Sequence, residues 1–108
     1  GTGLNMREWI YVEDNCEGVM KAVLNGAPGS IYNLGSGNEK NNLDLVKEIL
    51  LNMGKSLSLV EMVEDRKGHD FRYFIDSDIS YDELNWKPDT DFSKGIKKTI
   101  RYYESKSK

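Results

Sequence analysis

The chain has 108 residues, of which 38% are hydrophobic and 31% charged, and its formal net charge is -3. This length and composition predict one soluble globular domain, and the negative charge excludes a global attraction to nucleic acid or anionic membranes. The single cysteine, Cys16, excludes an internal disulfide and favours a reducing cytoplasm. No apolar run has the length of a membrane span, and no signal-peptide pattern is present. Because the first residue is Gly1 and not Met, we expect a part of a larger protein.

The first third of the chain predicts a strand, a helix and a second strand. Residues 6–12 (MREWIYV) are rich in aromatic and β-branched side chains, which favours a strand. Asp14 and Glu17 have the spacing of a capping box, which predicts a helix that starts near Asp14. Asn25-Gly26 is typical of a helix end, and residues 30–35 (SIYNLG) favour a short strand. The periodicity predicts that one apolar face of this helix is buried: Cys16, Val19, Met20, Val23 and Leu24.

The rest of the chain predicts three more helices. The first ends at Gly54 and carries the apolar residues Leu45, Val46, Ile49, Leu50 and Met53. Residues 58–64 (SLVEMVE) predict a strand parallel to residues 30–35, because a helix connects the two, and residues 71–76 favour a short extended segment. Ser77 is expected to cap a short helix that ends at Leu84. The last helix places one set of residues on a single face, and residues 104–108 are expected to fray: Phe92, Ile96, Thr99, Ile100 and Tyr103.

These elements predict a single small α/β domain over residues 1–108, with three or four short strands and four helices. Two motifs within it imitate cofactor chemistry. The segment LGSGNEK follows a predicted strand, but its third glycine position holds Lys40 and Gly37 lies well before the next helix, which favours a simple turn over a dinucleotide site. Tyr102 and Lys106 have the Tyr-x-x-x-Lys spacing of short-chain dehydrogenases, yet they lie at the chain end without a positioned serine. His69 is the only histidine, so no metal site is predicted.

Three polar features are candidates for binding an anion. Arg7 has a planar guanidinium that suits a phosphate, although pairing with a neighbouring glutamate explains it equally well. Asn41 or Asn42 is the natural N-cap of the following helix, and that helix end also offers backbone N–H groups to an anion. The loop at residues 65–70 (DRKGHD) places ionisable groups around a glycine, and its ordinary interpretation is a solvated turn.

Four blocks resemble, in the same order, consecutive blocks of the dTDP-glucose 4,6-dehydratases: GTGLNMREWIYVEDNCEGV, GSIYNLGSGNEKNNLDLVKEIL, DRKGHDFRYFID and ELNWKPDTDFSKGIKKTIRYY. The first block is similar in many extended short-chain dehydrogenases, whereas YNLGSGNEKNN, DRKGHDFRYFID and LNWKP are more specific to the dehydratases. The resemblance implies the small C-terminal, substrate-binding subdomain of an extended short-chain dehydrogenase, an α/β unit with the Rossmann domain absent.

Enzymes of this family are NAD-dependent lyases that convert dTDP-glucose to dTDP-4-keto-6-deoxyglucose. Their cofactor loop and catalytic residues precede the region present here, so the resemblance implies that this chain holds no catalytic residue, binds no NAD and is inactive alone. It implies that Arg7 and Asn42 contact the substrate pyrophosphate. The family's Asp-Arg-Pro-Gly-His substrate loop matches Asp65, Arg66, Lys67, Gly68 and His69. Because Lys67 replaces a proline of fixed φ, we expect a more mobile loop with one more cation.

The expected ligand is a nucleotide-diphosphate sugar similar to dTDP-glucose. The expected protein partner is a second copy of this chain or a separate cofactor-domain protein in the cytoplasm, and no nucleic acid or membrane is expected. Three alternatives stay open. The chain is a truncated, stand-alone nucleotide-sugar binding module, or a piece of a related epimerase or decarboxylase, or a dinucleotide-binding protein that uses Gly35 and Gly37.

Overall fold

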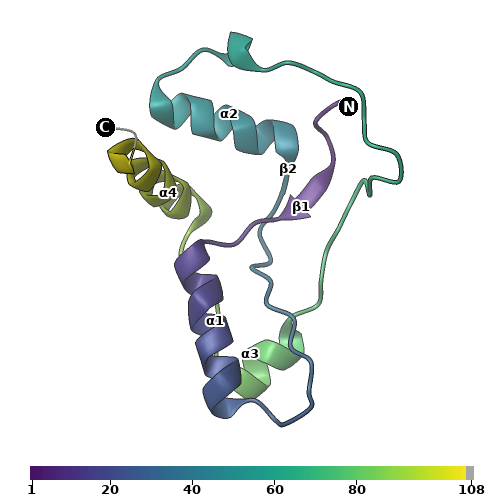
Figure 1. Cartoon of the computed structure of the whole chain (residues 1–108), viewed down its shortest axis with the longest axis vertical. Coiled ribbons are helices and arrows are strands. Elements are labelled where there is room, and N and C mark those ends of the chain that lie inside the picture. The colour runs from purple at the N-terminus through teal and green to yellow at the C-terminus, as the bar shows by residue number, and fades with distance from the viewer. Residues whose placement is uncertain (107–108) are drawn as a thin grey trace.

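The computed structural model describes residues 1–106 as an open α/β unit (Figure 1). The elements in chain order are β1 (Met6–Glu8), α1 (Val12–Asn25), β2 (Glu39–Asn41), α2 (Asn42–Met53), the 3-10 turn η1 (Leu57–Leu59), α3 (Asp78–Leu84) and α4 (Phe92–Lys106). The α/β class and the four predicted helices are confirmed, but the described residues hold two strands and not three or four. Among these helices, none is both long and apolar enough to cross a bilayer.

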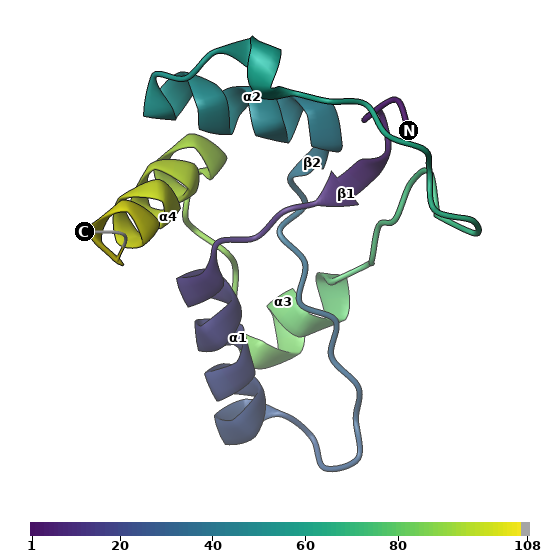
Figure 2. The same ribbon diagram turned by 45° about the horizontal axis from the view of Figure 1, so that its top comes forward.

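Two helix pairs make up most of the unit. α2 packs against α4, and α1 packs against α3. Figure 2 shows the first pair at one end of the molecule and the second pair at the other, with β1 and β2 between them. β1 and β2 are antiparallel, with Arg7 opposite Lys40. The radius of gyration is 16.3 Å, whereas a compact domain of this length has one of about 13 Å, so the unit is spread out.

The core is small and lies where α1 meets α3. Among the described residues, the hydrophobic side chains that are buried are Leu84, 0% exposed, and Trp86, 3% exposed. The Trp86 indole N–H donates to the backbone oxygen of Asp14 at 3.0 Å. Gly18 lets the two elements approach closely, because a Cβ at this position would lie 2.9 Å from Trp86 Cε2. A single indole thus fills most of the core.

The strand predictions fail where a neighbouring strand is absent. The strand predicted at 6–12 ends at Glu8, and residues 30–35 form no strand within the described chain. The strand predicted at 58–64 is also wrong, because the structure has η1 there followed by irregular backbone. In the extended segment predicted at 71–76, Arg72 forms an isolated parallel bridge with Met6. β2, by contrast, lies in a segment predicted as a loop. Side-chain composition favours strands, but only a paired backbone makes one.

The predicted start of the first helix is wrong by two residues. α1 begins at Val12 with Tyr11 as its N-cap, and no side chain caps it. Asp14 is 4% exposed and accepts hydrogen bonds from the backbone N–H and the hydroxyl of Thr90, both at 3.1 Å. The carboxylate therefore fixes a segment distant in sequence and is not available as a cap. The helix ends at Asn25, as predicted.

The predicted buried face of α1 is the opposite of the observed one. Cys16 is exposed, and the other members of the predicted face are between 50% and 77% exposed: Val19, Met20, Val23 and Leu24. The residues of α1 that are buried are Asp14 and Gly18. An amphipathic helix normally turns its apolar side toward the core, so this face lacks a covering layer within the described chain.

The other helix predictions are confirmed with one change. α2 ends at Met53, with Gly54 in the left-handed conformation at φ 66°, and α3 ends at Leu84. Ser77 precedes α3, but its hydroxyl accepts a hydrogen bond from Gly35 N at 2.7 Å and does not cap the helix. α4 continues to Lys106, so residues 104–106 are helical, and residues 107–108 of the predicted tail lie outside the described residues.

A tight turn interrupts the exposed segment between η1 and α3. The backbone N–H of His69 donates to Arg66 O at 3.2 Å, and Gly68 has φ 73°. This is the pattern of a type II turn, with Lys67 at the position that proline favours and Gly68 at the position that needs positive φ. The turn geometry of this loop therefore persists without the proline.

We predict that Asp14→Ala lowers the free energy of unfolding by about 1–3 kcal/mol, because it leaves the buried Thr90 donors without an acceptor. Urea unfolding followed by circular dichroism measures the change. Glu17→Ala, on the exposed side of the same helix, is the matched control and should change stability by less than about 0.5 kcal/mol. Equal effects of the two variants would show that the Asp14 contact carries no stability.

We predict that Lys67→Pro stabilises the chain by about 0.4–1 kcal/mol, because it restricts the unfolded chain at a position that already suits proline. Gly68→Ala should destabilise by roughly 1 kcal/mol or more, since its φ is positive. Thermal unfolding of the two variants beside the parent measures both signs. A destabilising Lys67→Pro would contradict the type II turn.

Candidate ligand-binding site

A cavity of about 410 Å³ brings together residues that the sequence separates. The N-terminal segment forms one wall, the start of α2 forms another, and residues 60–66 with His69 form the third. Four of the predicted site residues line it: Asn42, Asp65, Arg66 and His69. The other members of the predicted loop, Lys67 and Gly68, are exposed at the tip of the turn. Sequence reasoning did not identify Gly3 and Asn5 as wall residues, because nothing in their local pattern marks them.

Arg7 lies beside this cavity and is held in place by backbone oxygens. Its Nη1 donates to Met6 O at 2.7 Å, and its Nη2 donates to Asp70 O at 2.8 Å. Nη2 also lies 3.0 Å from His69 Nε2. Pairing of Arg7 with a neighbouring glutamate, the alternative explanation from sequence, is absent from the ion pairs of residues 1–106.

Two guanidinium groups meet at the His69 imidazole. Arg66 Nη2 lies 3.0 Å from Nδ1 of the same ring whose Nε2 faces Arg7. A neutral imidazole has one nitrogen that accepts and one that donates, whereas a guanidinium only donates. One of the two contacts therefore sets a donor against a donor. An oxyanion beside the ring would accept from the guanidinium and the imidazole N–H and remove this conflict.

The charge balance separates these arginines from a third one nearby. Arg72 Nε donates to Glu39 Oε2 at 2.7 Å, and its Nη2 contacts the other oxygen of the same carboxylate. The hydrogen bond from Arg72 lowers the pKa of Glu39 below its ordinary value. No ion pair to Arg7 or Arg66 occurs within residues 1–106. Arg72 is thus neutralised by a carboxylate, whereas the two arginines at His69 are not.

The backbone at the start of α2 is not available to an anion. Asn42 N donates to Asn5 O at 3.1 Å, and Leu43 N donates to Gly3 O at 2.7 Å. Asp44 N donates to Oδ1 of Asn41, the N-cap, at 2.7 Å. The expectation that this helix end offers backbone N–H groups to a phosphate is therefore wrong. Of the two candidate caps, Asn41 caps the helix, and the Asn42 side chain is left at the cavity wall.

The glycine loop between α1 and β2 does not suit a dinucleotide. Gly35 N donates to the Ser77 hydroxyl at 2.7 Å, and Gly37 N donates to Glu8 Oε2 at 2.5 Å. Glu8 Oε1 is buried without a hydrogen-bond partner. Burial, and then the charge of Glu8, raises the pKa of Tyr81, whose hydroxyl donates to Gly35 O at 2.6 Å. A carboxylate at the loop amides would repel a pyrophosphate, so these residues do not fit NAD.

The remaining motifs place no catalytic group. Lys106 Nζ lies 5.5 Å from the centre of the Tyr102 ring, and both residues are exposed. This is a cation–π contact on a helix surface and lacks the held geometry of an acid–base pair. Within residues 1–106 no cluster of three metal-ligating side chains occurs.

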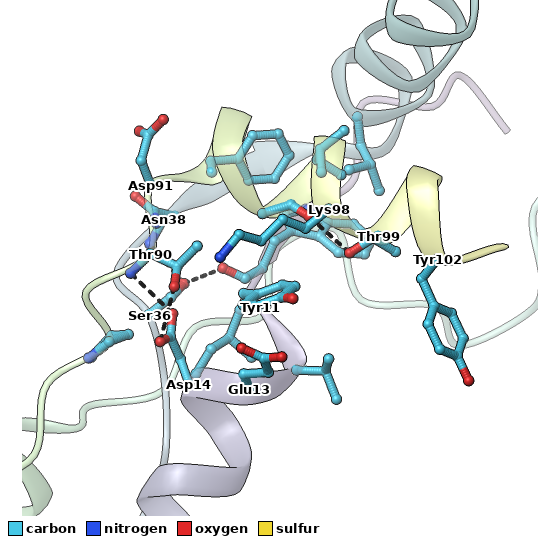
Figure 3. A pocket seen from close by; sticks show the side chains of 18 of the residues that line it. Tyr11, Glu13, Asp14, Ser36, Asn38, Thr90, Asp91, Lys98, Thr99 and Tyr102 are labelled. Carbon is cyan, nitrogen blue, oxygen red and sulfur yellow. Dashed lines mark hydrogen bonds between the residues drawn. The ribbon is translucent and has the colours of Figure 1, made fainter. Parts of the chain in front are cut away.

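A second, larger cavity of about 710 Å³ lies between the start of α1 and α4 (Figure 3). The figure shows Asp14 and Thr90 joined by hydrogen bonds at one side and Tyr102 at the far side. Lys98 Nζ lies 5.7 Å from the centre of the Tyr11 ring. Burial raises the pKa of Tyr11, to which Glu13 also contributes. Most of the lining is apolar, and none of the predicted site residues belongs to it.

Comparison with known proteins gives a consistent result. The family model described as GDP-mannose 4,6 dehydratase matches residues 1–99. A dTDP-glucose 4,6-dehydratase of Streptomyces antibioticus is 45% identical over 103 residues, which are 95% of this chain and 31% of that protein. The crystal structure of DesIV, a dTDP-glucose 4,6-dehydratase of Streptomyces venezuelae with NAD and TYD bound, has a TM-score of 0.91 and 38% identity over 97% of this chain and 33% of DesIV.

A dTDP-glucose 4,6-dehydratase of Bacillus anthracis, solved in complex with NAD, superimposes with a TM-score of 0.88 and 37% identity over 97% of this chain and 33% of that protein. This chain therefore spans about a third of the length of the relatives that it matches. The resemblance to a portion of the dTDP-glucose 4,6-dehydratases is confirmed by sequence and by fold. Since the family model covers nearly all of it, the chain belongs to the GDP-mannose 4,6-dehydratase family.

Proposed function

We propose that this chain is the substrate-binding portion of a dTDP-glucose 4,6-dehydratase and that it binds the diphosphate of a nucleotide sugar. The observation that carries the proposal is the meeting of Arg7 and Arg66 at the His69 ring, beside a cavity of about 410 Å³. Two cations without a carboxylate partner in the described chain form a site that an anion completes. The names of the relatives supply the substrate class.

Each proposed residue has a distinct part in binding. Arg7 offers a guanidinium that Met6 O and Asp70 O already orient, so little side-chain entropy is lost when it binds a phosphate oxygen. Asn42 offers a side-chain amide from the wall of the cavity. The turn formed by Arg66, Lys67, Gly68 and His69 supplies further donors and closes over the diphosphate, and Asp65 flanks it.

The chemical steps belong to the rest of the enzyme. NAD supplies hydride acceptance and return when it is bound to a cofactor domain, and the residues of this chain bind and orient the sugar nucleotide. The dehydratase reaction, a lyase activity, thus requires a cofactor-domain polypeptide as partner. The exposed free thiol of Cys16 fits the reducing cytoplasm. Of the alternatives, the carboxylate of Glu8 at Gly37 counts against a stand-alone dinucleotide-binding protein.

We predict weak binding of dTDP by the purified chain, with a dissociation constant on the order of millimolar, equivalent to roughly -4 kcal/mol. Arg7→Ala should cost about 1.5–3 kcal/mol, the range for hydrogen bonds to charged groups, and should remove detectable binding. Titration of dTDP into isotope-labelled protein, followed by NMR, measures both.

The control for this titration is Arg101→Ala, which removes an exposed arginine from α4, far from the cavity in sequence and structure. It should bind dTDP as well as the parent does. Shift changes that spare Arg7, Asn42 and residues 65–69, or an Arg7→Ala variant that binds normally, would contradict the site assignment.

We also predict that the chain alone does not dehydrate dTDP-glucose, with or without added NAD, because the described residues hold no positioned acid–base set and no loop that fits the cofactor. The assay is the alkali-generated absorbance of the 4-keto product. Turnover above that of a heat-inactivated sample would contradict the prediction.

A further inference from the structure

Residues 30–35 leave one edge of their backbone without partners. Asn33 O accepts from the Ser80 hydroxyl at 2.6 Å. Gly35 N donates to the Ser77 hydroxyl, and Gly35 O accepts from the Tyr81 hydroxyl. The odd-numbered residues thus bond to side chains in and just before α3. Within residues 1–106, the backbone N–H and C=O groups of Tyr32 and Leu34 have no hydrogen-bond partner.

This alternation is that of a β-strand with one edge covered and the other open. In an extended strand, successive residues point their N–H and C=O groups to opposite edges. The side chains of Tyr32 and Leu34 face α1, because a Cβ on Gly26 would meet Tyr32 Cε2 at 3.0 Å and a Cβ on Gly18 would meet Leu34 Cδ1 at 3.2 Å. The open edge therefore lies on the side away from α3, under α1.

The exposed face of α1 lies on the same side. α1 contacts the region of α3 through Asp14, which accepts the Thr90 bonds, and through Lys21, whose Nζ donates to Asn85 O at 3.2 Å. At about 100° per residue, Val23 lies about 180° and Val19 about 140° around the helix from Asp14. Val23 is 77% exposed and Val19 is 50% exposed. An open strand edge and an uncovered apolar face thus adjoin each other.

We propose that this surface, the Tyr32–Leu34 edge with the Val19 and Val23 face of α1, binds a second copy of the chain about a two-fold axis at Asn33. A strand edge is complementary to itself in antiparallel pairing. With the axis at Asn33, Tyr32 of each copy exchanges both backbone hydrogen bonds with Leu34 of the other. None of these residues is charged, so the negative net charge of the chain places no like charges in contact there.

The helices follow from the strands. Because α1 covers its own strand, pairing two strands brings the two α1 helices side by side and antiparallel, with their Val19 and Val23 faces toward each other. The rim is complementary too. Glu17 and Lys21 share the next flank of α1, and antiparallel packing sets the glutamate of one copy near the lysine of the other. The dimer thus buries apolar surface that monomeric proteins rarely leave exposed.

Sedimentation velocity over a wide dilution series of the purified chain measures the association. The parent should form a dimer, and Val23→Asp should weaken dimerisation at least about tenfold, because it sets like charges against each other in an apolar contact. Leu51→Asp is the matched control, since Leu51 is 79% exposed on α2 and outside the surface; it should leave dimerisation unchanged. An equimolar mixture of Val23→Asp and Val23→Lys should recover the dimer.

Residue-resolved amide hydrogen exchange identifies the surface. As the concentration rises, the amides of Tyr32 and Leu34 should gain protection, whereas those of Ile31 and Asn33 should not. A monomer at every concentration overturns the proposal, and so does a dimer that Val23→Asp leaves intact or that fails to protect Tyr32 and Leu34. Protection of these amides only by an added cofactor-domain polypeptide, with the chain itself monomeric, overturns the second copy in favour of that competing occupant.

Discussion

The Trp86 side chain is the contact on which the arrangement of the helices depends. Its ring lies against Gly18 of α1, its centre is 5.6 Å from that of Tyr81 in α3, and its N–H donates to Asp14 O. The Asp14 carboxylate continues this connection to Thr90, just before α4. Three helices thus take their relative positions from one indole and one carboxylate. Any side chain larger than hydrogen at position 18 would push α1 off the indole, which explains the glycine within a helix that it otherwise weakens.

The polar half of the molecule is held by backbone hydrogen bonds. Gly3 and Asn5 accept from the first residues of α2, and Asp70 O accepts from both the Asn5 side chain and Arg7 Nη2. The segment that carries His69 is thereby fastened to β1, and the Arg7 guanidinium is oriented before any ligand arrives. Arg7 therefore has a structural contact as well as its proposed contact with a phosphate, and the two use different hydrogens of one group.

Sequence predicts the features that depend on neighbours along the chain. Gly54 stops α2, Asn41 caps it, and the apolar period of α4 places the helix correctly, because each of these is a local property. The strands fail because pairing depends on distant backbone, as residues 30–35 and 58–64 show. Asp14 has the spacing of a cap, yet a residue far along the chain uses its carboxylate.

The same division applies to the candidate site. Arg7, Asn42 and residues 65–69 could be named from the resemblance to the dehydratases, and the structure brings most of them to one cavity. The contribution of Gly3 and Asn5 could not be predicted, since it depends on backbone atoms whose positions only the fold defines. The meeting of two guanidinium groups at one imidazole was equally out of reach, because it joins β1 to a loop by side-chain geometry.

The misplaced face of α1 is informative because its pattern is correct for a helix whose apolar side is covered. Periodicity reports the environment that a helix needs, and it does not say whether the covering layer comes from the same described chain. Here the chain covers the Gly18 side, while Val19 and Val23 remain exposed beside the open edge of Tyr32 and Leu34. A helix and a strand that fail to find partners on the same side of a fold are unlikely to be independent accidents of sequence. One covering layer, formed of a strand with a helix above it, satisfies both requirements at once.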